Sequence, residues 1–187
     1  MLTARTLTEA QVYESMLTAA DESAAAVPPP ELQPGVNLVD GERSWIFHST
    51  AGPIEVEYES ESAARKLGVP FGLGVSTLLD AAQWAILAST FGRRALTADM
   101  AYTGQPDQDR STVEVNWEYA AYAVREALKF LPDDADQVPE SAIWSEFGRQ
   151  ALAESPQLLH RAKLLDDLQY YEGTLADFRA LYDGPSA

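Results

Sequence analysis

Four acidic side chains at alternate positions form the best candidate for a functional site in this sequence. They are Glu55, Glu57 and Glu59, on a predicted strand, followed by Glu61 at the start of a short helix predicted over residues 61–67 and ended by Gly68. On an extended strand, alternate residues project from the same side, about 7 Å apart. Because like charges in a row repel one another, such a row favours a basic partner that docks against it. The same charges could instead discourage sheets from pairing edge to edge, and the sequence leaves both interpretations open.

His48 is expected to lie across from Glu55 and to join this candidate partner-binding site. A carboxylate neighbour favours the protonated imidazole, so the pair could act as a pH-sensitive contact. An ordinary polar pair between two strands is the simpler interpretation. The second histidine, His160, falls on the polar side of a predicted helix, where solvent exposure is expected.

Asp80 and Trp84 mark a candidate pocket, because Asp80 is the only charge in an otherwise apolar segment. An ionised carboxylate that is buried without a partner costs much free energy. Asp80 could therefore lie in the first turn of a helix, or line a pocket as a general acid or base. It could also pair with an arginine, namely Arg93, Arg94 or Arg125. Trp84, one turn further on, would be its nearest large neighbour.

The familiar catalytic and metal-binding patterns are missing from the sequence. There is no cysteine, which excludes disulfides, thiol nucleophiles and zinc sites built on thiolates. Gly74-Val75-Ser76 lacks the second glycine of a Gly-x-Ser-x-Gly turn, since Leu78 stands there. Neither histidine lies in a metal-binding spacing. We therefore predict no catalytic residue, no bound metal and no cofactor.

The element expected to organise the chain is a helix predicted over residues 75–91. Its apolar residues cover nearly the whole circumference, which is typical of a helix packed on several neighbours. The segment is short and contains Asp80, so a membrane span is not expected. Ser76 is expected to cap its start, and Gly92-Arg93-Arg94 to end it.

Residues 36–59 switch to a two-residue periodicity, which predicts a three-stranded antiparallel meander. Asp40-Gly41 indicates the first turn, and a four-residue loop at 50–53 would make the second. With that loop, Phe47 faces Val56 on an apolar face, and the acidic row lies on the opposite face. The predicted strands are residues 36–39, 42–49 and 54–59.

Helices are expected to make up the rest of the chain. The first is predicted over residues 8–25, capped by Thr8 and Gln11, and a proline-rich linker at 27–34 follows it. The first helix could dock on the body or extend from it. Later helices are predicted to begin at Ser111, Pro139, Ser155 and Thr174, with Ile143, Trp144 and Phe147 facing inward and Gly173 as a stop. Together these elements predict one mostly helical α+β domain spanning residues 1–187, with the meander packed on about five to six helices.

The net charge of −16 is concentrated in the two flanks of the chain. Residues 1–62 carry −9 and residues 131–187 carry −7, whereas residues 63–130 are balanced. Direct binding to nucleic acid is disfavoured, because its phosphates would be repelled. Solubility alone could account for the acidity. A basic protein partner is the alternative.

Three functional hypotheses follow from these observations. The leading one is a non-enzymatic, cytoplasmic interaction module, most concretely an immunity protein or antitoxin that inhibits a basic toxin or nuclease. The cytoplasmic location is expected because the N-terminal sequence lacks the apolar segment of a signal peptide. The second hypothesis is a small-molecule-binding protein or small enzyme with a site around Asp80 and His48. The third is a scaffold subunit that self-assembles through its helical faces.

Overall fold

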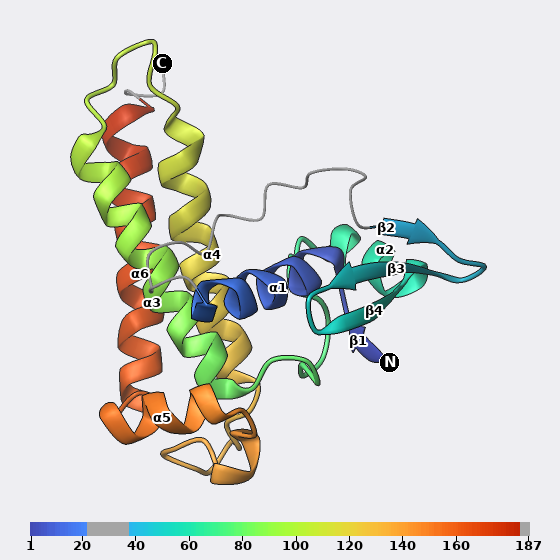
Figure 1. Cartoon of the computed structure of the whole chain (residues 1–187). Helices are drawn as coiled ribbons and strands as arrows, with labels where there is room; N and C mark the ends of the chain where they lie inside the picture. Colours follow the sequence, from blue (N-terminus) through green and yellow to red (C-terminus); the bar gives the residue numbers. More distant parts are fainter. Residues whose placement is uncertain (22–37, 184–187) are drawn as a thin grey trace. The chain divides into compact units, whose positions relative to one another are not determined.

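The computed structural model describes residues 1–21 and 38–183 of the 187-residue chain. The chain divides into two compact units, Met1–Leu79 and Asp80–Ala187. The first contains a sheet and two helices, and the second is helical (Figure 1). The general α+β class is confirmed, whereas a single domain stays a prediction. The predicted linker at 27–34 and the end of the predicted first helix lie outside the described residues.

The first unit is built on a four-stranded mixed sheet in the order β1-β4-β3-β2. β1 pairs in parallel with β4, and the other neighbouring strands are antiparallel. The predicted three-stranded antiparallel meander is therefore wrong by one strand, because residues 2–4 add a parallel edge. The strands are β1 (Leu2–Ala4), β2 (Leu38–Asp40), β3 (Ser44–Ser49) and β4 (Gly52–Glu57).

The loop between β3 and β4 is two residues long, not four. Phe47 lies opposite Ile54 rather than Val56, because the strands pair from Ser49 and Gly52 onward. Gly52 has a φ of 111°, which a glycine adopts without steric cost. The register differs by two residues from the predicted one, and side chains alternate with a period of two. The predicted faces are therefore correct although the predicted pairs are wrong.

Two helices complete this unit, α1 (Leu7–Asp21) and α2 (Tyr58–Leu67). α1 begins after Thr6, whose hydroxyl accepts a hydrogen bond from the Glu9 backbone N–H at 3.1 Å, so Thr6 rather than Thr8 caps it. α1 packs on the sheet. The core between them consists of Ala4, Ala10, Ile54, Val56 and Leu78, with Leu2, Leu7, Tyr13, Trp45 and Phe47 packed against it.

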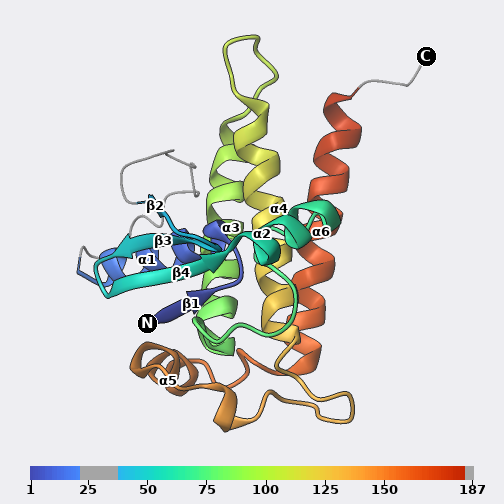
Figure 2. The ribbon, with the colours of Figure 1, turned by 90° about the vertical axis from the view of Figure 1, so that its right-hand side faces the viewer.

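Three long helices form the body of the second unit (Figure 2). They are α3 (Ala81–Ala101), α4 (Arg110–Leu128) and α6 (Arg161–Tyr182). α4 packs along both α3 and α6. The connection from α4 to α6 contains a short 3-10 turn, η1 (Glu140–Ala142), and the helix α5 (Glu146–Glu154).

The central helix is displaced from its predicted bounds at both ends. It starts after Asp80 rather than near Val75, because the Ser76 hydroxyl binds the backbone N–H groups of Leu78 and Leu79 in a separate turn. It also continues through Gly92. A Cβ atom at that position would lie 2.6 Å from Cε1 of Tyr171 in α6. Gly92 therefore permits close helix packing and does not end the helix.

The later helices also begin at different residues than predicted. Asp109 rather than Ser111 caps α4 and accepts the Ser111 backbone N–H at 2.9 Å. α5 and α6 start after Ser145 and His160. Gly173 lies inside α6, so the two predicted C-terminal helices are one. A glycine inside a helix costs only about 1 kcal/mol, which the packing of a long helix offsets.

Candidate functional site

The predicted acidic row is divided between two elements. Glu55 and Glu57 lie on β4, whereas Glu59 and Glu61 lie on α2, because the chain turns into a helix at Tyr58. The expected row of three carboxylates on one strand is therefore wrong at Glu59, whereas Glu61 lies on a helix as expected.

Two of these carboxylates are engaged within their own unit. Glu55 accepts a hydrogen bond from the Ser44 hydroxyl at 2.8 Å. Glu61 accepts the backbone N–H of Leu7 at 2.8 Å and the Arg65 guanidinium at 3.3 Å. Bonds of this kind stabilise the fold and reduce what a carboxylate can offer to a partner. Glu57 and Glu59 are exposed.

His48 is exposed on β3, but it does not lie opposite Glu55. Its partner in the register is Pro53, and Glu55 faces Ile46. The expected cross-strand pair of imidazole and carboxylate is therefore wrong. The binding of a partner by these five residues stays a prediction. His160 is exposed, as expected, and precedes α6.

Asp80 is fully buried and caps α3, the first of its three expected placements. Its Oδ1 accepts the backbone N–H of Gln83 at 2.9 Å, and the Gln83 side chain accepts the Asp80 N–H at 2.9 Å. This is a complete capping box. The sequence signal was present in Asp80 and Gln83, three residues apart, but the apolar run before them obscured the start of the helix.

The second oxygen of Asp80 reaches the start of α5. Oδ2 accepts the backbone N–H of Trp144 at 3.1 Å, and both the N–H and the hydroxyl of Ser145, at 2.8 Å and 2.6 Å. Ser145 in turn caps α5 by accepting the Gly148 N–H at 2.9 Å. One carboxylate therefore fixes the starts of two helices.

This arrangement gives Asp80 a structural role. Neutral donors compensate its burial, so the expected pairing with an arginine is not what satisfies it; Arg125, for example, pairs with Glu172. Trp84 is likewise fully buried. A pocket at Asp80 and Trp84 stays a prediction.

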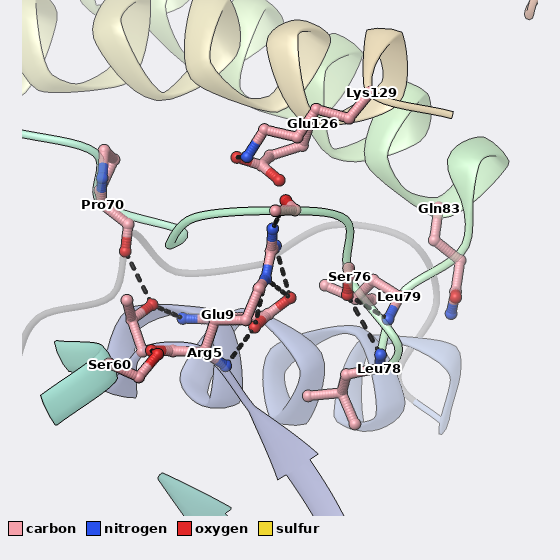
Figure 3. A network of polar contacts seen from close by, with 12 residues as sticks. Arg5, Glu9, Ser60, Pro70, Ser76, Leu78, Leu79, Gln83, Glu126 and Lys129 are labelled. Atoms are coloured by element: carbon pink, nitrogen blue, oxygen red, sulfur yellow. Dashed lines mark hydrogen bonds and ion pairs between the residues drawn. The ribbon is translucent and has the colours of Figure 1, made fainter. Parts of the chain in front are cut away.

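A second buried carboxylate, which was not predicted from the sequence, lies in the first unit (Figure 3). The side chain of Glu9 is 1% exposed and forms an ion pair with Arg5 at 2.7 Å. Arg5 also donates to the Gly74 carbonyl oxygen at 2.5 Å and accepts, through its own carbonyl oxygen, the Ser60 hydroxyl at 2.8 Å. The pair joins the start of α1 to two distant segments. Arg5 and Glu9, four residues apart across a helix start, were the available signal.

Two large aromatic side chains in the second unit are exposed, contrary to expectation. Trp144 and Phe147 retain 43% and 46% of their accessible surface. Both were expected to face inward from a helix beginning at Pro139. The helix instead begins after Ser145, so Trp144 precedes it and only Phe147 lies within it.

We call the surface around these residues the aromatic–acidic surface. Its aromatic members are Trp144, Phe147 and Phe130, whose ring centroid lies 5.9 Å from that of Trp144. The segment between α4 and α5 and α5 itself lie together at one end of the unit (Figure 1). The exposed acidic residues of this segment, which includes α5, are counted as its acidic members: Asp133, Asp134, Asp136, Glu140, Glu146 and Glu154.

Metal and membrane features are absent from the described part of the chain. Residues 1–21 and 38–183 contain no group of three or more His, Asp or Glu side chains placed to hold a metal ion. Within the same ranges, every helix is too short or too polar to cross a membrane.

Comparison of the chain with protein-family models, with curated proteins and with solved structures gave no match.

Proposed function

We propose that this chain is an acidic, non-enzymatic module that binds a basic protein partner. The observation that carries the proposal is the excess of 29 acidic over 13 basic residues, combined with the internal use of the basic ones. Arg149 and Arg161 donate hydrogen bonds to backbone carbonyl oxygens. Ion pairs engage Arg5, Arg65, Arg110, Arg125, Lys129, Lys163 and Arg179.

Each of these ion pairs also engages a carboxylate, so the net charge of −16 remains. A strongly negative surface attracts a positive partner, accelerates its encounter and disfavours acidic competitors. Nucleic acid and anionic membranes would be repelled for the same reason. A basic protein is therefore the class of partner that the charge supports best.

The most concrete form of this proposal is an immunity-like or antitoxin-like inhibitor that covers the basic active surface of a toxin or nuclease. An inhibitor needs no reactive group of its own, only complementary charge and shape. The acidity of residues 1–62 and of residues 131–187 fits such a role.

The proposal is tested by capture followed by reconstitution. The immobilised chain would be exposed to lysate of its own cells at about 50 mM NaCl, and bound protein eluted at high salt. We expect a protein of high isoelectric point whose purified form binds at least about tenfold more weakly at about 300 mM NaCl. Capture of acidic proteins only, or an affinity that salt does not change, would contradict the proposal. Loss of a toxic or nucleolytic activity of the partner on binding would support the inhibitor form.

A further inference from the structure

We infer that the aromatic–acidic surface is where the partner docks, and that the partner contributes a cationic segment that carries an apolar side chain. The inference rests on the proposed function and adds the place of contact and the chemistry of the contacting segment.

Exposed aromatic side chains are the first feature that favours docking at this surface. Tryptophan and other large aromatic residues contribute most of the binding energy in many protein interfaces. Here Trp144 and Phe147 lie three residues apart and leave nearly half of their surface in water. The contact with Asp80 does not require a tryptophan, because it uses only the backbone N–H of Trp144. Its exposed ring is therefore available for contact with a partner.

The rigidity of the site is the second feature that favours docking. The backbone of Trp144 is held from both sides, by Asp80 at its N–H and by the Arg149 guanidinium at its carbonyl oxygen, 2.7 Å away. The Phe130 ring packs beside the indole at 5.9 Å. A side chain that is fixed before binding loses little conformational entropy in the complex.

The local charge decides what kind of partner fits. Residues 130–160 contain six acidic residues and one basic residue, Arg149, whose guanidinium is bound to the Trp144 carbonyl. A second copy of this chain would bring the same negative charge and be repelled. A basic polypeptide segment would be attracted, and an apolar residue within it could pack on the exposed rings.

The test uses a defined probe and the full-length chain. A fluorescent lysine-rich peptide with one central leucine is titrated into the protein, in parallel with a peptide that has serine in place of leucine. We expect the leucine peptide to bind at least about tenfold more tightly. Trp144→Ala and Phe147→Ala should each remove most of that difference.

Matched controls separate this surface from general acidity. Leu181→Ala removes a more exposed apolar side chain, 72% exposed, on α6 and should leave binding within about twofold. Asp134→Asn with Glu140→Gln should weaken both peptides, and Asp166→Asn with Asp177→Asn on α6 should weaken them less. Thermal melting of each variant confirms that it folds. If Trp144→Ala does not fold, Phe147→Ala alone tests the contribution of the aromatic side chains.

The outcomes distinguish the inference from the proposed function. Equal binding of the two peptides, or binding unaffected by Trp144→Ala and Phe147→Ala, would overturn the inference while leaving a basic partner in place. Concentration-dependent dimers that these two variants abolish would overturn it in favour of self-association. Failure of both peptides to bind would count against the inference and the proposed function together.

Discussion

Asp80 joins two helix starts through the oxygens of one carboxylate. It is fully buried and accepts four hydrogen bonds, from Gln83, Trp144 and Ser145. A buried polar group whose bonds are all formed is tolerated, but the loss of one partner leaves the others unsatisfied. The residue that the sequence marks as a candidate for chemistry thus explains the local fold.

Substitution of Asp80 by asparagine tests this role. One carboxylate oxygen becomes an NH2 group that cannot accept a hydrogen bond, so we expect the free energy of unfolding to fall by about 2–4 kcal/mol. Urea denaturation followed by circular dichroism measures the change. Asp177→Asn, at an exposed position on α6, is the control and should change stability by less than about 0.5 kcal/mol. Equal effects of the two variants would show that Asp80 has no special role.

Tyr171 gives a second test at the scale of the residue. Burial, with a smaller contribution from the negative charge of Asp167, raises the pKa of its hydroxyl to about 12 from the ordinary value of 10.0. The unfolded chain then ionises first, so this contribution to stability is complete below pH 10.0 and is lost as the pH rises toward 12. Stability measured across this range should fall less in Tyr171→Phe than in the wild type. If stability falls equally with pH in both proteins, the raised pKa of Tyr171 is contradicted.

Close packing of α3 against α6 depends on the absence of a side chain at Gly92. A Cβ atom there would meet the Tyr171 ring at 2.6 Å, whereas at Gly173, also within a helix, it would find open space. Gly173→Ala should stabilise the protein by up to about 1 kcal/mol through helix propensity. Gly92→Ala should be less stable than Gly173→Ala by about 1–3 kcal/mol, because the same gain is outweighed by overpacking. Thermal melts of the two variants measure this difference. Similar stabilisation by both substitutions would contradict the close contact between Gly92 and the Tyr171 ring.

At the scale of the element, hydrophobic periodicity predicted which side chains are buried better than single residues predicted where helices end. The two-residue period of β3 and β4 assigned Trp45 and Phe47 to the buried face correctly, because the error in register was an even number of residues. Of the glycines interpreted as helix stops, Gly68 does end α2, whereas two others do not end a helix. Gly92 and Gly173 both lie inside helices, and tertiary contacts that the local sequence does not reveal decide this.

The candidate site was less predictable than the fold, for a physical reason. Whether Glu55 faces a partner or binds Ser44 depends on the register of strands, which local spacing cannot determine. The exposure of Trp144 and Phe147 depends on a helix that begins at Ser145, a start fixed by the distant Asp80. Long-range contacts of this kind determine which side chains are exposed, and a periodic sequence pattern does not reveal them.

At the scale of the whole molecule, the net charge of −16 affects stability as well as binding. Repulsion among surplus carboxylates disfavours the folded state, and salt screens it. We therefore expect the melting temperature to rise by a few degrees between about 10 mM and 300 mM NaCl. Raising the osmolarity to the same extent with glycerol controls for effects other than charge. A melting temperature that NaCl leaves constant or lowers would contradict this view.

The most direct test of the central claim is hydrogen exchange of the chain with and without its purified basic partner. The account predicts that the partner slows exchange most strongly between residues 130 and 154, which include Trp144 and α5, and that about 300 mM NaCl reduces this protection. Protection confined to β3 and β4 would show that the partner binds the carboxylates of the sheet instead. Unchanged exchange of residues 130–154 in a saturated complex would contradict the account.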